Sequence, residues 1–319
     1  MYGGQIVGHL IDGKWNNDDV ATSDKNGKFQ REQSQFRLSI SAEESKYQPE
    51  TNRYHLYVSY ACPWAHRALI TRKLKGLEEV ISFDVVHPDM LEHSWTFNKD
   101  FNGATGDSLY GKKYLYEIYQ KDNESVTTKV TVPVLWDKKT ESIVNNKSSE
   151  IIRILNSAFN AFSKNDIDLY PRQLREEIDK INELTYEPIN NGVYKTGFSK
   201  NQSAYEGAFN ELFSALKEIE AHLGGKDFLV GNRLTEADIR LVTTLLRFDS
   251  VYYSHFKCNL KKIAEYEHLS RYLKNLYKME AVKSTTNLEH IKRHYYYSHD
   301  FINPNRIVPL GPSEESLAF

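Results

Sequence analysis

The stretch RYHLYVSYACPWAHRALITRKLKGLEEVISFDVVH, residues 53–87, predicts a β-strand, a helix and a second β-strand. Apolar and more polar residues alternate up to position 60, which is the period-two pattern of a strand. Pro63 suits the first position of a helix, because its missing N–H would be unpaired there in any case. The run ISFDVV at 81–86 predicts the second, buried strand. Together these elements predict a right-handed βαβ unit with Cys62 at the mouth of its helix.

Cys62 is the strongest candidate for chemistry. Unpaired amides and the helix dipole at this position favour a thiolate, and can lower a thiol pKa from about 8.5 into the range of roughly 3.5 to 7.5. A buried structural cysteine is the alternative, but a strand followed by Cys-Pro and a helix favours a reactive thiol. Ala65 occupies the place of the second cysteine of a Cys-x-x-Cys motif. An external thiol must therefore resolve any disulfide at Cys62, and glutathione is the abundant cytosolic one.

Composition limits the classes of function. A chain of 319 residues can form two domains, and its net charge of −2, from 41 basic and 43 acidic residues, suggests neither a nucleic-acid nor a membrane partner. The two cysteines, Cys62 and Cys258, argue against a disulfide scaffold and fit a reducing compartment. The polar N-terminus has no secretory signal, and no run approaches the ~18 apolar residues of a membrane span. These features predict a soluble, cytoplasmic protein.

The pattern changes along the chain predict four parts. Residues 1–50 show no sustained periodicity and predict an extended N-terminal arm, and residues 51–160 predict an α/β domain. Apolar stripes at helical spacing, a stop before Pro188 and the capping box Thr235-Glu-Ala-Asp238 predict an all-helical domain over 161–295. The remaining residues, 296–319, are interpreted as a tail.

The α/β part also contains a long connection and a hairpin. Residues 87–128 form no recognisable compact crossover, and loops of this length inside a domain are commonly functional. VTVPVLWDKKTESIVNNKSSEIIRIL at 130–155 predicts a hairpin followed by a helix. Ser148 or Ser149 would serve as the N-cap of that helix.

Three segments carry a family resemblance. YACPWAHRALI at 60–70, LTEADIRLVTTLLRFDSVYYSHFKCN at 234–259 and RHYYYSHDFINPNRIVPLGP at 293–312 resemble the glutathionyl-hydroquinone reductases, the xi class of the glutathione transferases. The likeness runs from about GHLIDGKW at 8–15 to the tail. Cys-Pro-Trp alone would also fit the omega class. The resemblance implies a thioredoxin-like N-terminal domain, an all-α C-terminal domain, a homodimer, glutathione as co-substrate and no tightly bound cofactor.

The resemblance also implies a set of residues that bind glutathione. Pro133 would be cis and face Cys62, so that the residue before it offers its backbone to the glutathione peptide, and the mouth of the helix after the hairpin would take the γ-glutamyl end. Trp95 would pack against glutathione, with a partly buried loop anchor as the alternative. The implied binding residues are Trp95, Lys129, Val130, Val132, Pro133, Lys147 and Ser148.

Two of these positions depart from the family pattern. Lys147 stands where an acidic residue usually holds the γ-glutamyl ammonium, and Lys129 stands where an arginine is expected. A lysine cannot neutralise an ammonium and cannot form a guanidinium fork.

Three tyrosines in separate helical segments, Tyr194, Tyr252 and Tyr295, are implied to line a pocket opposite Cys62. Phenolic hydroxyls there could donate a proton or stabilise a thiolate. Core packing is the alternative, and Tyr296 or Tyr297 could take the place of Tyr295.

Two further features are interpreted as structural. His290 and His294 have the spacing of helical metal ligands, but lysine and arginine lie between them, so a solvated helix face is expected and no metal. Cys258 lacks a strand-to-helix setting and is interpreted as a small buried side chain.

The sequence thus predicts a reductase that removes glutathione from S-glutathionyl hydroquinones through a Cys62–glutathione mixed disulfide. Tyr194 would give a proton to the leaving carbon. Two alternatives remain: an omega-like thioltransferase or dehydroascorbate reductase, and a catalytically silent, dimeric glutathione-binding protein. Lys147 and Lys129 are the features that favour the silent protein.

Overall fold

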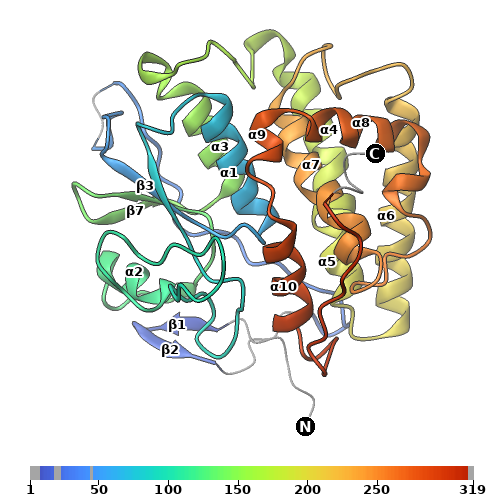
Figure 1. The fold of residues 1–319 in the computed structure, drawn as a ribbon, viewed down its shortest axis with the longest axis horizontal. Coiled ribbons are helices and arrows are strands. Elements are labelled where there is room, and N and C mark those ends of the chain that lie inside the picture. The colour runs from blue at the N-terminus through green and yellow to red at the C-terminus, as the bar shows by residue number, and fades with distance from the viewer. Residues whose placement is uncertain (1–7, 18–22, 44–45, 315–319) are drawn as a thin grey trace. The chain divides into compact units, whose positions relative to one another are not determined.

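The computed structural model describes residues 8–17, 23–43 and 46–314, which pack as two compact units (Figure 1). The predicted boundaries placed a helical domain over 161–295 and a tail after it, whereas part of the C-terminal region packs with the α/β unit. Unit 1 comprises residues within 1–20, 33–167 and 289–306, and unit 2 comprises residues within 21–32, 168–288 and 307–319.

Unit 1 is built on a mixed sheet in the order β4-β3-β6-β7. β3 pairs in parallel with β4, while β6 is antiparallel to both β3 and β7. The strand–helix–strand and hairpin–helix predictions are confirmed by this order. The elements are β3 (Tyr54–Val58), α1 (Pro63–Leu74), β4 (Ser82–Val85), α2 (Leu115–Asp122), β6 (Val134–Asp137), β7 (Ser142–Asn145) and α3 (Ser148–Ser157).

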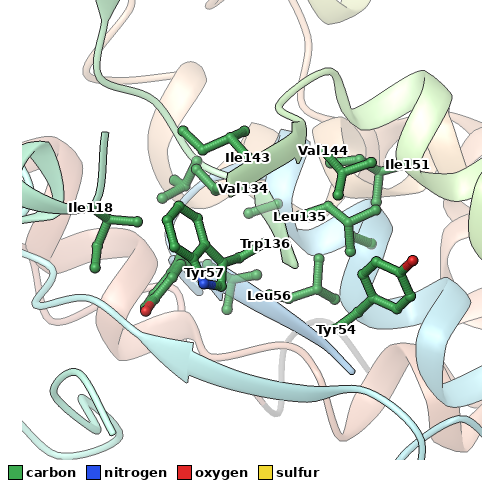
Figure 2. Packing of buried hydrophobic residues seen from close by; sticks show 14 of the residues in the cluster. Tyr54, Leu56, Tyr57, Ile118, Val134, Leu135, Trp136, Ile143, Val144 and Ile151 are labelled. Carbon is green, nitrogen blue, oxygen red and sulfur yellow. The ribbon is translucent and has the colours of Figure 1, made fainter. Parts of the chain in front are cut away.

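Apolar side chains cover both faces of the sheet. Every residue of β3 is buried, as expected for a strand covered on two sides. Figure 2 shows Trp136 on the side of Ile118 from α2, and Leu135 on the side of Ile151 from α3. The alternation along β6 therefore divides its side chains between two core layers.

Short elements escaped the sequence prediction. The loop at 87–128 contains α2, and the arm contains β1 (His9–Ile11) and β2 (Lys14–Asn16). These strands form a second sheet with β5 (Thr128–Lys129), in the order β2-β1-β5. Strands of two or three residues are too short to show a period, so their pairing is decided by tertiary contacts.

Residues 36–38 of the arm lie along the outer edge of β7. The Leu38 amide donates to the Val144 carbonyl at 2.9 Å, and the Asn146 amide donates to the Phe36 carbonyl at 3.0 Å. The arm therefore covers backbone groups that an edge strand would otherwise expose.

Unit 2 is helical. The last helix of the chain, α10 (Leu288–Ser298), belongs to unit 1 except for its first residue. The predicted capping box is present, because Asp238 accepts from the Thr235 amide at 2.8 Å and the Thr235 side chain accepts in return. The other helices are α4 (Arg175–Thr185), α5 (Gly192–Gly197), α6 (Gln202–His222), α7 (Glu236–Arg247), α8 (Glu267–Tyr277) and α9 (Glu280–Lys283).

Two π-helical turns interrupt this unit, η3 (Tyr186–Asn190) and η4 (Phe248–Tyr252). The α-helix α4 ends at Thr185, before Pro188 as predicted, but the chain continues through the π turn η3 toward α5, which the sequence did not predict. Around Pro188 the α-helical hydrogen bonds are thus replaced by bonds between residues five apart. Such turns occur frequently at functional sites.

Within the described part of the chain, no helix is both long and apolar enough to cross a membrane.

Candidate active site

Cys62 occupies the N-cap position of α1, with Pro63 in the first turn. Its extended backbone (φ −77°, ψ 120°) turns the chain from β3 into the helix, and its carbonyl accepts from the His66 amide at 3.0 Å. The residue is only 9% exposed. The sulfur therefore lies at the amide end of α1, as the sequence predicted.

The peptide bond between Val132 and Pro133 is cis, as the resemblance implied. The Cys62 thiol donates to the Val132 carbonyl, with 3.5 Å between sulfur and oxygen. Next to this turn, the Tyr119 hydroxyl donates to the Thr131 carbonyl at 2.8 Å and accepts from the Thr131 amide. The structure thus brings together Cys62 and the backbone expected to bind the glutathione peptide.

The mouth of α3 differs from the prediction. Ser148 is the first helical residue and Lys147 takes the N-cap position, so neither predicted serine is the cap. The Lys147 amide is satisfied by the Asn145 side chain at 2.7 Å. This bond orients the chain before α3, but no side chain of the described residues caps the first-turn amides of the helix, which leaves them able to bind an anion.

The Lys147 ammonium lies 3.5 Å from the Glu150 carboxylate, at i and i+3. Glu150 also accepts from the Arg37 guanidinium and, at 3.0 Å, from the Asn145 side-chain Nδ2. Partial burial acts to raise the pKa of Glu150, but the hydrogen bonds from Arg37 and Asn145 outweigh it and hold that pKa below its usual value. Arg37 comes from the arm, so the arm sets the charge balance at this helix mouth.

Arg67 is a residue that the sequence reasoning missed. It is 1% exposed, its guanidinium lies 4.5 Å from the Trp64 ring centroid, and it reaches the Ser148 hydroxyl at 3.5 Å. A buried cation behind the mouth of α3 favours an anion at that mouth. An arginine at a core position of the Cys-Pro helix was the available signal.

Trp95 is buried and stacks on the His294 ring of α10, with centroids 4.8 Å apart and planes 20° apart. The His294 Nδ1 lies 2.8 Å from the Pro88 carbonyl, and the His290 Nε2 lies 2.6 Å from the Asn102 carbonyl. Both histidines are buried, so the predicted solvated face is wrong. They connect α10 to the loop that carries Trp95.

Arg293 strengthens this connection. Its guanidinium donates to both oxygens of Asp89, at 2.7 Å each, and its Cζ lies 3.4 Å from the Tyr297 ring centroid. The Met90 amide donates to the Ser298 hydroxyl at 2.9 Å. We call the contacts of α10 with residues 87–102 the loop clamp.

Within unit 2, Tyr194 and Tyr252 are neighbours, with ring centroids 5.9 Å apart. Tyr252 belongs to η4, while Tyr194 follows η3 in α5, and Phe256 contacts both rings. A β-carbon at Gly197 would come within 2.3 Å of Phe256, so only glycine allows this close packing. Two of the three predicted tyrosines, Tyr194 and Tyr252, are therefore in contact in the structure.

Tyr295 lies in unit 1, where its ring contacts His294 and His299. Tyr296 is also buried, whereas Tyr297 has Arg293 and Arg306 over its ring. Tyr297 thus packs against Arg293, the arginine of the loop clamp.

Two of the implied glutathione residues lie before the cis peptide. Lys129 pairs with His9 in the small sheet, and Val130 is buried. The sequence alone did not show that a strand of the arm, β1, pairs with the strand that contains Lys129.

Cys258 is fully buried, which raises the pKa of its thiol strongly and confirms the prediction of a small buried side chain. Both cysteines are free thiols. Among residues 8–17, 23–43 and 46–314, no group of three or more His, Cys, Asp or Glu side chains could hold a metal ion.

Comparison with known proteins gives two family matches. Residues 61–158 match the family described as "Glutathione S-transferase, N-terminal domain". Residues 202–275 match "Glutathione S-transferase, C-terminal domain".

Full-length relatives give a more specific picture. Glutathionyl-hydroquinone reductase YqjG of Escherichia coli is 48% identical over 97% of this chain and 96% of its own, and its glutathione-bound structure gives a TM-score of 0.89. Glutathionyl-hydroquinone reductase PcpF of Sphingobium chlorophenolicum is 50% identical, with 97% of each chain covered. The glutathione-S-transferase Xi structure from Phanerochaete chrysosporium is 49% identical, covers 92% of this chain and 95% of its own, and has a TM-score of 0.90.

Proposed function

The chain belongs to the xi class of the glutathione transferases, and on that premise we propose that it is a glutathionyl-hydroquinone reductase. The observation that carries the proposal is the placement of Cys62 at the amide end of α1, 3.5 Å from the carbonyl that precedes cis-Pro133. A single thiol at such a site can accept and release a glutathionyl group, but it cannot close an internal disulfide.

The first half of the reaction breaks the carbon–sulfur bond. The Cys62 thiolate attacks the sulfur of the glutathionyl hydroquinone, and the aromatic carbon leaves with the bonding electrons and takes a proton from the Tyr194 hydroxyl. Hydroquinone is released, and the enzyme holds a Cys62–glutathione disulfide. Tyr252 and Tyr295 are proposed to line the same pocket.

The second half restores the enzyme. A second glutathione attacks the mixed disulfide as its thiolate, releasing oxidised glutathione and the Cys62 thiolate. The proton from this second thiol returns to Tyr194. Two glutathione sulfurs are thus oxidised to one disulfide while the carbon is reduced, so no tightly bound cofactor is required.

Glutathione binding is assigned to the groups around Cys62. The Val132 backbone would bind the glutathione peptide, and Ser148 with the α3 amides would hold the γ-glutamyl carboxylate, helped by the buried charge of Arg67. Bound glutathione would compete with the Cys62 thiol for the Val132 carbonyl, which favours the thiolate in the complex. Trp95, Lys129, Val130 and Lys147 complete the proposed set.

The deciding experiment compares two substrates with the wild-type protein. A glutathionyl-hydroquinone should be turned over with glutathione, and a simple alkyl disulfide should be a poorer substrate. High disulfide or dehydroascorbate turnover without glutathionyl-hydroquinone cleavage would instead identify an omega-like thioltransferase. Absence of both activities, with glutathione still bound, would identify the silent binding protein.

Replacing Lys147→Glu is expected to lower the KM for glutathione. A carboxylate at this position can accept a charge-assisted hydrogen bond from the γ-glutamyl ammonium, which is worth about 1.5–3 kcal/mol, or roughly one to two decades in affinity. Arg37 already binds Glu150, so the added negative charge would face a neutralised neighbour. The measurement is the KM for glutathione at fixed electrophile.

Lys147→Gln is the matched control, because it removes the positive charge without adding a carboxylate. Its KM should fall much less. If Lys147→Glu leaves the KM unchanged or raises it, another group holds the ammonium.

Replacing Arg293→Met is expected to raise the KM for glutathione roughly tenfold with little change in kcat. The substitution removes the two-bond contact with Asp89, and a charge-assisted contact of this kind contributes about 1.5–3 kcal/mol to holding its partner. The loop carrying Trp95 would then lose part of its support. Arg293→Lys keeps the charge but loses the two-bond guanidinium contact, so its KM for glutathione should lie between those of the wild type and Arg293→Met. A lower melting temperature with an unchanged KM would show that the clamp serves stability alone.

The remaining assignments concern the cell and the assembly. We propose a cytoplasmic homodimer, supported by two free thiols and by the dimeric habit of the superfamily that the sequence resembles. Light scattering of the purified protein measures the assembly directly.

A further inference from the structure

The segment of the arm at 23–32 packs within unit 2 rather than with the rest of the arm. The Lys200 amide donates to the Gly27 carbonyl at 3.0 Å, and the Asn201 side chain donates to the Asn26 carbonyl at 2.9 Å. The Phe29 and Phe198 rings lie 5.4 Å apart. These contacts fix the segment beside residues 198–201, which directly follow α5, the helix of Tyr194.

Arg31, in this segment, faces the Tyr194 ring. Its Cζ lies 4.8 Å from the Tyr194 centroid, while its Nε donates to the Asn191 side-chain oxygen at 2.8 Å. Asn191 is 3% exposed and donates in turn to Glu187 at 3.3 Å. The guanidinium is therefore held in one place over the phenol ring.

One neighbouring carboxylate, Glu187, interacts with the Arg31 charge and is itself paired with a lysine. Glu187 is 2.6 Å from Lys195, and together they form a neutral pair beside Asn191. Three aromatic rings also contact the Tyr194 ring: Phe198, Tyr252 and Phe256. In such surroundings a nearby cation interacts more strongly with a phenol than it would in bulk water.

A cation over a neutral phenol gains a modest attraction from the ring, and it gains more once the phenol becomes a phenolate. An interaction that grows along the reaction coordinate lowers the barrier, whereas one that is constant does not. We propose that Arg31 is a positioning residue that holds the Tyr194 ring and stabilises the tyrosinate formed when Tyr194 gives up its proton. The inference rests on the proton-donor role proposed above for Tyr194.

The test is a double-mutant cycle with Arg31→Met and Tyr194→Phe on the full chain. Arg31→Met should reduce glutathionyl-hydroquinone turnover roughly tenfold, the scale of a partly desolvated cation–aromatic contact, and reduce disulfide turnover less than about twofold. In the Tyr194→Phe background it should cause no further loss. Arg31→Lys keeps the charge and should recover much of the activity. Equal losses on both substrates, or a full loss in the Phe background, would overturn the inference.

A second measurement does not need the reaction. With ring-labelled tyrosine, the Tyr194 signal is the one absent from Tyr194→Phe, and its ionisation can be followed by NMR. The midpoint should move to higher pH in Arg31→Met. An unmoved midpoint overturns the inference even if turnover falls, whereas a moved midpoint in a protein that does not cleave glutathionyl-hydroquinones supports it and refutes the proposed function.

The matched control is Arg175→Met in the same unit. The Arg175 Cζ lies 5.0 Å from the Tyr170 ring centroid, so the substitution removes a similar cation–aromatic contact that does not involve Tyr194. It should leave both the turnover ratio and the Tyr194 midpoint unchanged. A change equal to that of Arg31→Met would show a general effect of lost charge, and would overturn the inference.

Discussion

Cys62→Ser is expected to abolish turnover of both glutathionyl-hydroquinone and disulfide substrates, a loss on the order of 10³-fold or more for removal of a covalent nucleophile. A serine oxygen cannot form the disulfide through which both reactions pass. Intact mass after exposure to oxidised glutathione should show one adduct on the wild type and none on the variant. Cys62 is the expected site because the amide end of α1 lies behind its sulfur.

Cys258→Ala is the matched control, since it removes the other sulfur. Burial raises the pKa of Cys258 and shields it, so this variant should keep both its activity and its single adduct. An adduct on Cys258 of the wild type with Cys62 unmodified, or substantial turnover by Cys62→Ser, would contradict the assignment.

Tyr194→Phe is expected to lower glutathionyl-hydroquinone turnover by about 10²–10⁴-fold, the usual scale of general acid catalysis. The substitution removes the proton donor and keeps the ring that packs against Tyr252 and Phe256. A simple disulfide releases a thiolate that needs little protonation, so its turnover should change only a few fold. The ratio of the two kcat values is therefore the quantity to measure.

Tyr253→Phe is the control for the loss of a hydroxyl, because Tyr253 follows directly on Tyr252 in the same segment. It should behave as the wild type on both substrates. Equal losses on both substrates in Tyr194→Phe would indicate an effect on Cys62 or on folding, and would leave Tyr194 as a packing residue.

Local patterns were sufficient to predict the long, regular elements. The alternation in β3, the Cys-Pro junction and the capping box of α7 each depend on contacts within a few residues, which the sequence displays directly. The short strands of the arm, the π turn through Pro188 and the cap of α3 were missed or misplaced. Their backbone partners come from distant segments, or from a helix geometry that no periodicity encodes.

The candidate site divides in the same way. The sequence by itself identified Cys62 as the candidate nucleophile and showed that Ala65 replaces the second cysteine of a Cys-x-x-Cys motif, because both follow from residue type and spacing. Only the tertiary structure showed three arginine contacts within the two units: Arg37 on Glu150, Arg293 on Asp89 and Arg31 over Tyr194. Each joins residues more than 100 positions apart in the chain. An arginine is readily placed on a solvated surface, so its residue type does not reveal which distant partner it contacts, and only the folded chain decides that.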